Sequence, residues 1–169
     1  MASKKGIVIT VLILVVITGA SFLTYYPNLI PENSETTFVV SDYGAYIDGV
    51  KNIHEILQES INIEYQNLHN GDISTSDYIS IADITSSQVT AQISEFVTSK
   101  PPQEWQESYI GYMEALKKFN EYIVETKVAA NLIEKESFEE EMAETIQKIE
   151  SLKEESKQLV KKSDELRPN

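Results

Sequence analysis

The stretch WQESYIGYMEALKKFNEYIVETKVAANLI, residues 105–133, decides the fold class. Its regularly spaced side chains recur in steps of four and three: Trp105, Tyr109, Tyr112, Leu116, Phe119, Ile123, Thr126, Ala130 and Ile133. This spacing is typical of one face of an α-helix, and the preceding prolines are tolerated at a helix start, so a helix is predicted over 102–135. We expect the fold to depend most on Trp105, because truncating a buried Trp costs about 3–5 kcal/mol.

The segment that follows repeats the pattern and predicts a second, separate helix beginning at Ser137. Ser137 and Glu140 have the spacing of a capping box, and the distribution of charge along the segment matches the helix dipole. The alternative to a tight hairpin is one continuous helix approaching roughly 100 Å. Past Leu152 the stripe alternates Leu with Ser, so we expect this end either to fray or to meet a partner helix. The candidate partner-binding residues are Leu152, Ser156, Leu159, Ser163 and Leu166.

Working upstream, residues 42–69 also have helical spacing. The predicted buried stripe is Tyr43, Tyr46, Val50, Ile53, Leu57, Ile61, Tyr65 and Leu68. Ser41 is a plausible N-cap, and Asn70-Gly71 is a good stop signal. A helix over 42–69 is therefore predicted.

Residues 73–98 leave two interpretations open. They are rich in β-branched residues, and Val89, Ala91 and Ile93 alternate locally, which would suit a strand pair. The helical stripe is Tyr78, Ala82, Thr85, Val89, Ile93 and Phe96. Because no Gly or Pro turn interrupts the run between Ser76 and Pro101, we favour a helix. The chain is then predicted to be all-α, with an antiparallel four-helix bundle over 41–169.

The N-terminus predicts a membrane anchor. Lys4 and Lys5 precede twenty uncharged residues, 7–26, which as a helix would span about 30 Å, enough to cross the hydrocarbon core. The two lysines predict a cytoplasmic N-terminus, with residues 27–40 as a tether and the bundle outside the cytoplasm. The prediction is a single-pass protein of the cell membrane, with residues 1–26 as a transmembrane anchor or uncleaved signal.

Two alternatives apply to this anchor. Thr18-Gly19-Ala20 offers the small residues that a signal peptidase needs before Ser21. Lys4-Lys5-Gly6 before an apolar helix resembles the processing site of archaeal pilin-like subunits, which are cut after the glycine. Residues 1–26 also resemble the start of short, membrane-anchored, uncharacterised proteins of ammonia-oxidising archaea, a resemblance that implies anchoring and no activity.

Composition excludes several functions. The chain has 14 Lys and Arg against 27 Asp and Glu, a balance that argues against nucleic acid as a partner and against docking on anionic lipid. It has no cysteine, which excludes disulfides, thiolate metal sites and thiol nucleophiles.

The remaining residues suggest no catalytic, cofactor or metal site. His54 and His69 lie about 22 Å apart on one predicted helix, too far to share a metal, and we expect both at the surface. Residues 139–141 are consecutive glutamates whose side chains diverge around a helix, so a solvated first turn is favoured over a cation site. The aromatic row that includes Trp105 could line a ligand pocket, but packing is favoured.

Together these features predict a non-enzymatic interaction or scaffold module without a cofactor. It would be held to the membrane by its anchor, bind protein partners through helical faces, and serve as an accessory subunit of an envelope or membrane complex. A ligand-sensing bundle that acts through a partner is the first alternative, and a pilin-like subunit is the second.

Overall fold

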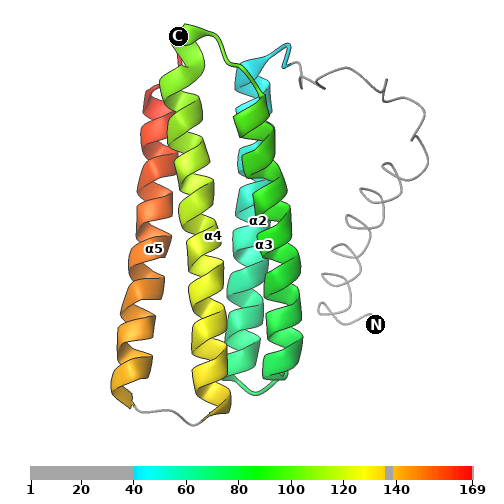
Figure 1. Cartoon of the computed structure of the whole chain (residues 1–169), viewed down its shortest axis with the longest axis vertical. Helices are drawn as coiled ribbons and strands as arrows, with labels where there is room; N and C mark the ends of the chain where they lie inside the picture. The colour runs from blue at the N-terminus through cyan, green and yellow to red at the C-terminus, as the bar shows by residue number, and fades with distance from the viewer. Residues whose placement is uncertain (1–39, 136–138, 169) are drawn as a thin grey trace, which may run out of the picture. The chain divides into compact units, whose positions relative to one another are not determined.

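The computed structural model describes residues 40–135 and 139–168, which form four long α-helices and one short 3₁₀-helix (Figure 1). The elements are α2 (Tyr43–His69), α3 (Thr75–Thr98), η2 (Gln103–Trp105), α4 (Gln106–Glu134) and α5 (Glu139–Glu165). The described residues contain no β-strand, so the all-α class is confirmed. The strand pair considered for 73–98 is wrong, because α3 covers nearly all of that segment.

The helices begin and end near the predicted points, with one correction to the caps. The N-cap of α2 is Asp42, not Ser41, and its carboxylate accepts a hydrogen bond from the amide three residues on (2.9 Å). The N-cap of α3 is Ser74, two residues before Ser76. Beyond the predicted end of α2, Gly71 has a φ of 71°, a conformation that glycine adopts without strain.

Helices α4 and α5 are separate and antiparallel, so the single continuous helix is wrong. Lys135 caps α4, and its amide donates to the carbonyl of Asn131. Ser137, the predicted N-cap of the last helix, lies outside the described residues. Their antiparallel direction follows from one close contact. A Cβ added at Gly111, near the start of α4, would lie 3.4 Å from the Cβ of Ser163, which is near the end of α5.

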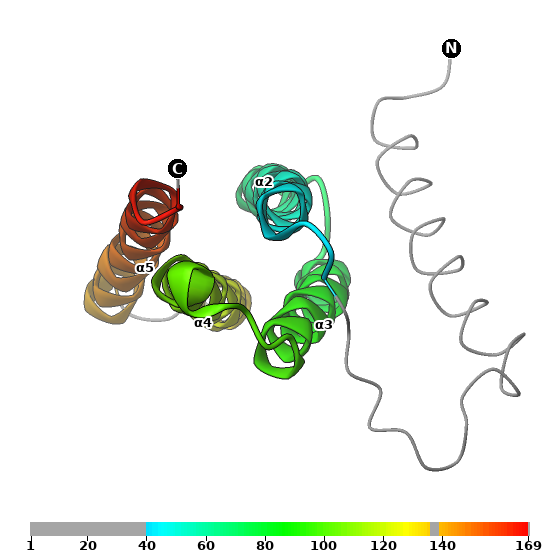
Figure 2. The ribbon, with the colours of Figure 1, turned by 90° about the horizontal axis from the view of Figure 1, so that it is seen from above.

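Figure 2 shows α4 between α3 and α5, with α2 beside α3. Helix α4 contacts each of the other three long helices, whereas α2 and α5 have few contacts with each other. The four helices therefore pack side by side in chain order, and the bundle closes only loosely where its first and last helices meet.

Aromatic side chains fill the core. Tyr78, Tyr112, Phe119 and Tyr122 are among its largest fully buried residues. The Tyr78 hydroxyl donates to Thr126 Oγ1 at 2.6 Å, so burial of that phenol leaves its polar atom satisfied. Burial raises the pKa of each of the three tyrosines, which stay neutral phenols at physiological pH.

Trp105 is not the centre of the core, contrary to the sequence-based expectation. It belongs to the short η2 turn at one end of the bundle, is only half-buried, and has its ring centroid 6.3 Å from that of Tyr43. The expectation failed because the helical stripe extends past the first turn of α4 to a residue that closes the end of the bundle.

The predicted anchor over 7–26 lies outside the described residues. Within residues 40–135 and 139–168, no helix is long and apolar enough to span a bilayer.

Truncating Phe119 should therefore destabilise the fold more than truncating Trp105 does. Phe119→Ala should lower the free energy of unfolding by about 3–5 kcal/mol, because Phe119 is completely buried. Trp105→Ala should cost less, because part of that ring already contacts solvent. Thermal unfolding followed by circular dichroism would measure both, and a larger loss for Trp105→Ala would contradict this description of the core.

Candidate functional site

The predicted partner-binding stripe on α5 is largely covered by the chain itself. Ser156 and Ser163 are fully buried against α4, and Leu152 is 7% exposed. The Ser156 hydroxyl donates to the carbonyl oxygen of Ala115 (2.9 Å), and the Ser163 hydroxyl donates to that of Ser108 (2.8 Å). The polar stripe is thus an intramolecular helix contact, and these three side chains are not free to meet a partner in this conformation.

The other two members of the stripe, Leu159 and Leu166, are half-buried. Partner binding through this pair stays a prediction. Serine appears in the stripe because α4 has small residues opposite it, including Gly111 and Ala115, so the two backbones approach closely. The buried hydroxyls then need acceptors, and the α4 carbonyls supply them.

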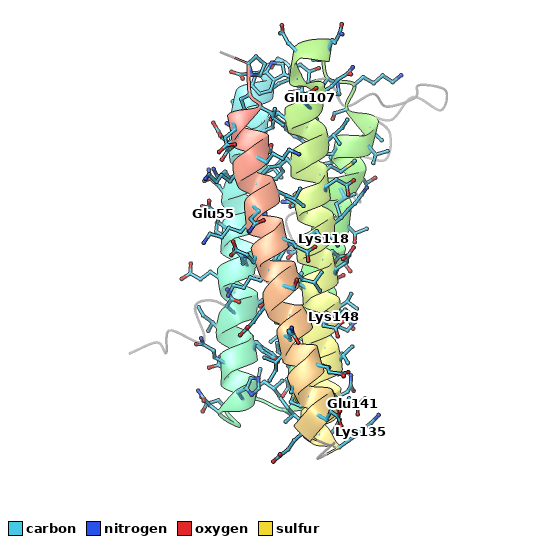
Figure 3. The ribbon with its side chains drawn as sticks, turned by 90° about the vertical axis from the view of Figure 1, so that its left-hand side faces the viewer. Glu55, Glu107, Lys118, Lys135, Glu141 and Lys148 are labelled. Carbon is cyan, nitrogen blue, oxygen red and sulfur yellow. The ribbon has the colours of Figure 1, made fainter. Side chains whose placement is uncertain are left out.

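A groove lies between α2 and α5, where the bundle is loosely closed. Its volume is about 230 Å³. The lining residues are Lys51, His54, Glu55, Gln58, Tyr112, Ser156, Lys157 and Val160. Figure 3 looks onto α5, with α2 to one side and the labelled Glu55 projecting from it. Residues more than 100 positions apart in the chain therefore share this site.

His54 is the unexpected member of the groove. We predicted a surface histidine, but the side chain is only 4% exposed, its Nδ1 lies 3.1 Å from the Tyr112 hydroxyl, and its ring centroid is 4.6 Å from that of Phe119. Burial lowers the pKa of His54 to about 4, because a buried imidazolium loses its hydration. At neutral pH the groove is lined by an uncharged imidazole.

The second ring nitrogen of His54, Nε2, is buried and has no hydrogen-bond partner among the described residues. Around it the groove carries both signs of charge. Lys51 is held by Asp164 on α5 at 2.6 Å, whereas Lys157 and Glu55 have no ion-pair partner within the described part of the chain. A small polar ligand could find one cation and one anion at this opening.

Metal and acid–base chemistry receive no support from the arrangement. No group of three or more His, Asp or Glu side chains within residues 40–135 and 139–168 is placed to hold a metal ion. Of the two histidines, His54 is buried while His69 is exposed at the end of α2. The predicted separation of the two imidazoles is consistent with these positions.

A second surface feature is an apolar patch on α2 and α3. Ile53, Ile56 and Ile63 of α2 are 48%, 63% and 40% exposed, and Ile84 of α3 is 44% exposed. We call these four residues the isoleucine face. Ile53 was predicted to be buried, and this was wrong because His54 occupies the core position beside it.

The contacts between α2 and α3 bring the isoleucine face together. Tyr46 lies against Phe96 and Tyr65 against Tyr78, with ring centroids 5.4 and 5.6 Å apart, which fixes the antiparallel register of the two helices. In this register Ile84 is level with the part of α2 between Ile56 and Ile63.

The orientation of the isoleucine face follows from helix geometry. Two positions along an α-helix correspond to a rotation of about 200°. Lys51 points to α5 and Ser86 bonds Asn120 of α4 at 2.7 Å, so Ile53 and Ile84, each two positions away, point away from those neighbours. The isoleucines therefore lie on the outer side of the α2–α3 pair.

His54 should make the stability of the fold depend on pH. The pKa is about 4 in the folded chain and near 6.5 in the unfolded chain, so the unfolded chain binds more protons between these values. The contribution is fully present above pH 6.5 and is lost as the pH falls toward 4, by up to roughly 3 kcal/mol. The free energy of unfolding should be measured at several pH values for wild type and for His54→Phe. As the pH falls from 6.5 to 4, wild type should lose stability relative to His54→Phe.

The matched control is His69→Gln, which alters an exposed imidazole and should keep the wild-type pH dependence. The prediction would be wrong if the difference in unfolding free energy between wild type and His54→Phe stayed constant from pH 7 to pH 4. That result would show that His54 takes up protons as readily in the folded chain as in the unfolded chain.

No protein-family model, curated protein or solved structure matches this chain. The chemistry of the described residues and the pattern of the sequence are therefore what support the function proposed below.

Proposed function

We propose that the protein is a membrane-tethered, extracytoplasmic helical interaction module without catalytic activity, an accessory subunit of an envelope or membrane complex. The observation that carries this proposal is the isoleucine face, four large apolar side chains exposed together on one side of a folded bundle. Contiguous exposed apolar patches on soluble domains mark surfaces that other molecules cover.

The location rests on the sequence. Twenty uncharged residues behind Lys4 and Lys5 favour insertion into a bilayer with the N-terminus in the cytoplasm. The formal net charge of −13 makes the domain a poor ligand for anionic lipid surfaces, so the anchor is what would hold it at the membrane. A helical bundle on a short tether then presents its outer faces to neighbouring membrane proteins.

A membrane-impermeant amine cross-linker added to intact cells tests both the location and the role of the face. We expect the wild-type chain to be captured in a cross-linked complex, and Ile56→Glu combined with Ile84→Glu to reduce its yield at least tenfold, because both charges would have to be desolvated at the contact. The matched control is Ile110→Glu, the same change at a 57% exposed isoleucine of α4, which should leave the complex intact.

Two outcomes would contradict the proposal. If the domain reacts only after cell lysis, it does not lie outside the cytoplasm. If the double variant forms the wild-type complex in full, the isoleucine face is not the contact.

A ligand-sensing bundle is the second candidate, favoured by the groove that contains His54. The buried Nε2 without a partner and the unpaired Lys157 would suit a small ligand with an acceptor group, such as a carboxylate. A panel of small carboxylates and amino acids at 100 times the dissociation constant should stabilise the fold by about 2.7 kcal/mol in a thermal-shift assay. Lys157→Gln should remove the effect, and the absence of any shift across the panel would reject this candidate.

A further inference from the structure

The hydrogen bond between His54 and Tyr112 decides which imidazole nitrogen carries the proton. The Tyr112 hydroxyl is completely buried, and within the described residues its hydrogen-bond partner is His54 Nδ1, at 3.1 Å. If Nδ1 carried the proton, both the phenol proton and His54 Nε2 would lack a partner. If the phenol donates to Nδ1, only Nε2 lacks one. The second arrangement leaves fewer buried polar atoms unpaired, so the proton of the neutral ring is assigned to Nε2.

His54 Nε2 is therefore a donor that needs an acceptor. No described residue accepts from it, the side chain is only 4% exposed, and His54 forms part of the wall of the groove between α2 and α5. Buried polar groups in folded proteins are nearly always paired with the protein, with water or with a ligand. A ligand that enters the groove to pair with Nε2 must offer an acceptor atom.

The charged side chains of the groove also specify what it can take. Lys51 is already paired with Asp164 at 2.6 Å. Glu55 of α2 and Lys157 of α5 line the same groove, are exposed, and form no ion pair with each other or with another residue in the part of the chain that the structure describes. A ligand between them meets one negative and one positive group, and a ligand with both charges pairs with both.

We propose that the groove binds a free α-amino acid in its zwitterionic form, with its carboxylate on Lys157 and His54 Nε2 and its ammonium group on Glu55. This inference rests on the second candidate function, the ligand-sensing bundle, and names the chemical class of its ligand. Because Glu55 belongs to α2 and Lys157 to α5, the ligand would join two helices that otherwise have few contacts with each other.

Ligands with one charge fit the groove less well. A simple carboxylate would leave Glu55 unpaired and would add a negative charge beside it, in a chain whose net charge is already −13. A simple amine would leave His54 Nε2 without an acceptor. The volume of about 230 Å³ is smaller than the roughly 300–1,000 Å³ of sites for drug-sized molecules, and half-buried Val160 offers an apolar contact for an aliphatic side chain.

A series of matched compounds tests the ligand class on the full chain in detergent. The common L-amino acids are tested singly by thermal shift, and the dissociation constant of the tightest binder is measured by calorimetry. Its amide, which lacks the carboxylate, and its N-acetyl derivative, which lacks the ammonium group, should each bind at least tenfold more weakly, because each leaves one charge of the groove unpaired. A derivative that binds as tightly as the amino acid would overturn the proposal, and so would the absence of any binding.

Variants at the two charged positions test the placement of the ligand. Lys157→Gln and Glu55→Gln should each weaken binding of the amino acid at least tenfold. The matched controls are Lys162→Gln and Glu59→Gln, which change the same residue types at exposed positions of α5 and α2 outside the groove and should leave the affinity unchanged. Wild-type affinity in either groove variant would contradict the proposed placement.

The protonation of His54 has a test of its own, because the chain contains only two histidines. In a chain with ¹⁵N-labelled histidine, His69→Gln identifies the signals of His54. At neutral pH they should be those of the Nε2–H form, and the Nε2 signal should move when the amino acid binds. The Nδ1–H form would overturn the proposal, because Nε2 would then be an acceptor and could not bind a carboxylate.

The outcomes separate this inference from the candidate function on which it rests. If a compound with one charge binds as tightly as the amino acid, and Lys157→Gln weakens that binding, the ligand-sensing bundle stands and the zwitterion is rejected. If neither amino acids nor small carboxylates bind, both fall. The interaction module is tested separately at the isoleucine face.

Discussion

The structure depends on the way α4 divides its surface between two kinds of contact. Toward α2 and α3 it presents large aromatic side chains, among them Tyr112 and Phe119, which are completely buried. Toward α5 it presents Ser108, Gly111 and Ala115, which let the two backbones approach. On the first side, the aromatic rings stabilise the bundle by burying apolar surface. On the second side, the backbones pack closely, and the buried serine hydroxyls are hydrogen-bonded to carbonyl oxygens of α4.

This division explains the loose closure between α2 and α5. Helix α5 packs mainly on α4 and has few contacts with α2. Two ion pairs join this end of the chain to α2: Lys51 with Asp164 at 2.6 Å, and Asp48 with Arg167, just past the end of α5, at 2.6 Å. Both pairs keep some contact with solvent, and ion pairs at a protein surface typically contribute only about 1 kcal/mol or less. The groove lined by Tyr112 thus lies where the contacts between helices are fewest.

The sequence predicted the helices well because their ends carry local signals. The turn at Gly71 and the periodicity of residues 105–133 do not depend on the rest of the chain. The strand alternative for 73–98 failed because each β-branched residue disfavours a helix by less than about 1 kcal/mol. Packing of one apolar stripe against the other helices outweighs that cost.

Side-chain burial was harder to predict than helix position. On α2, two stripes with helical spacing compete, and the sequence favoured the one that contains Ile53 over its neighbour His54. The structure buries the histidine because its ring finds Tyr112 and Phe119, which come from a helix more than 50 residues away. The sequence of α2 alone does not indicate that these two side chains will lie beside His54. Likewise, Ser156 can be buried because its hydroxyl donates to a carbonyl oxygen of α4, an acceptor that the sequence of α5 does not reveal.

The proposed membrane anchor and the isoleucine face would support each other energetically. Covering the exposed half of each of the four isoleucines would contribute about 1 kcal/mol per side chain, or about 4 kcal/mol for the whole face. Association in solution costs roughly 4–15 kcal/mol in lost translational and rotational freedom, so the face alone gives a weak contact. Attachment to a common bilayer removes part of that cost in advance, since both partners are already confined and oriented. If the chain is anchored as proposed, a modest apolar face would therefore be sufficient for binding, and it would avoid the aggregation that a larger exposed patch promotes.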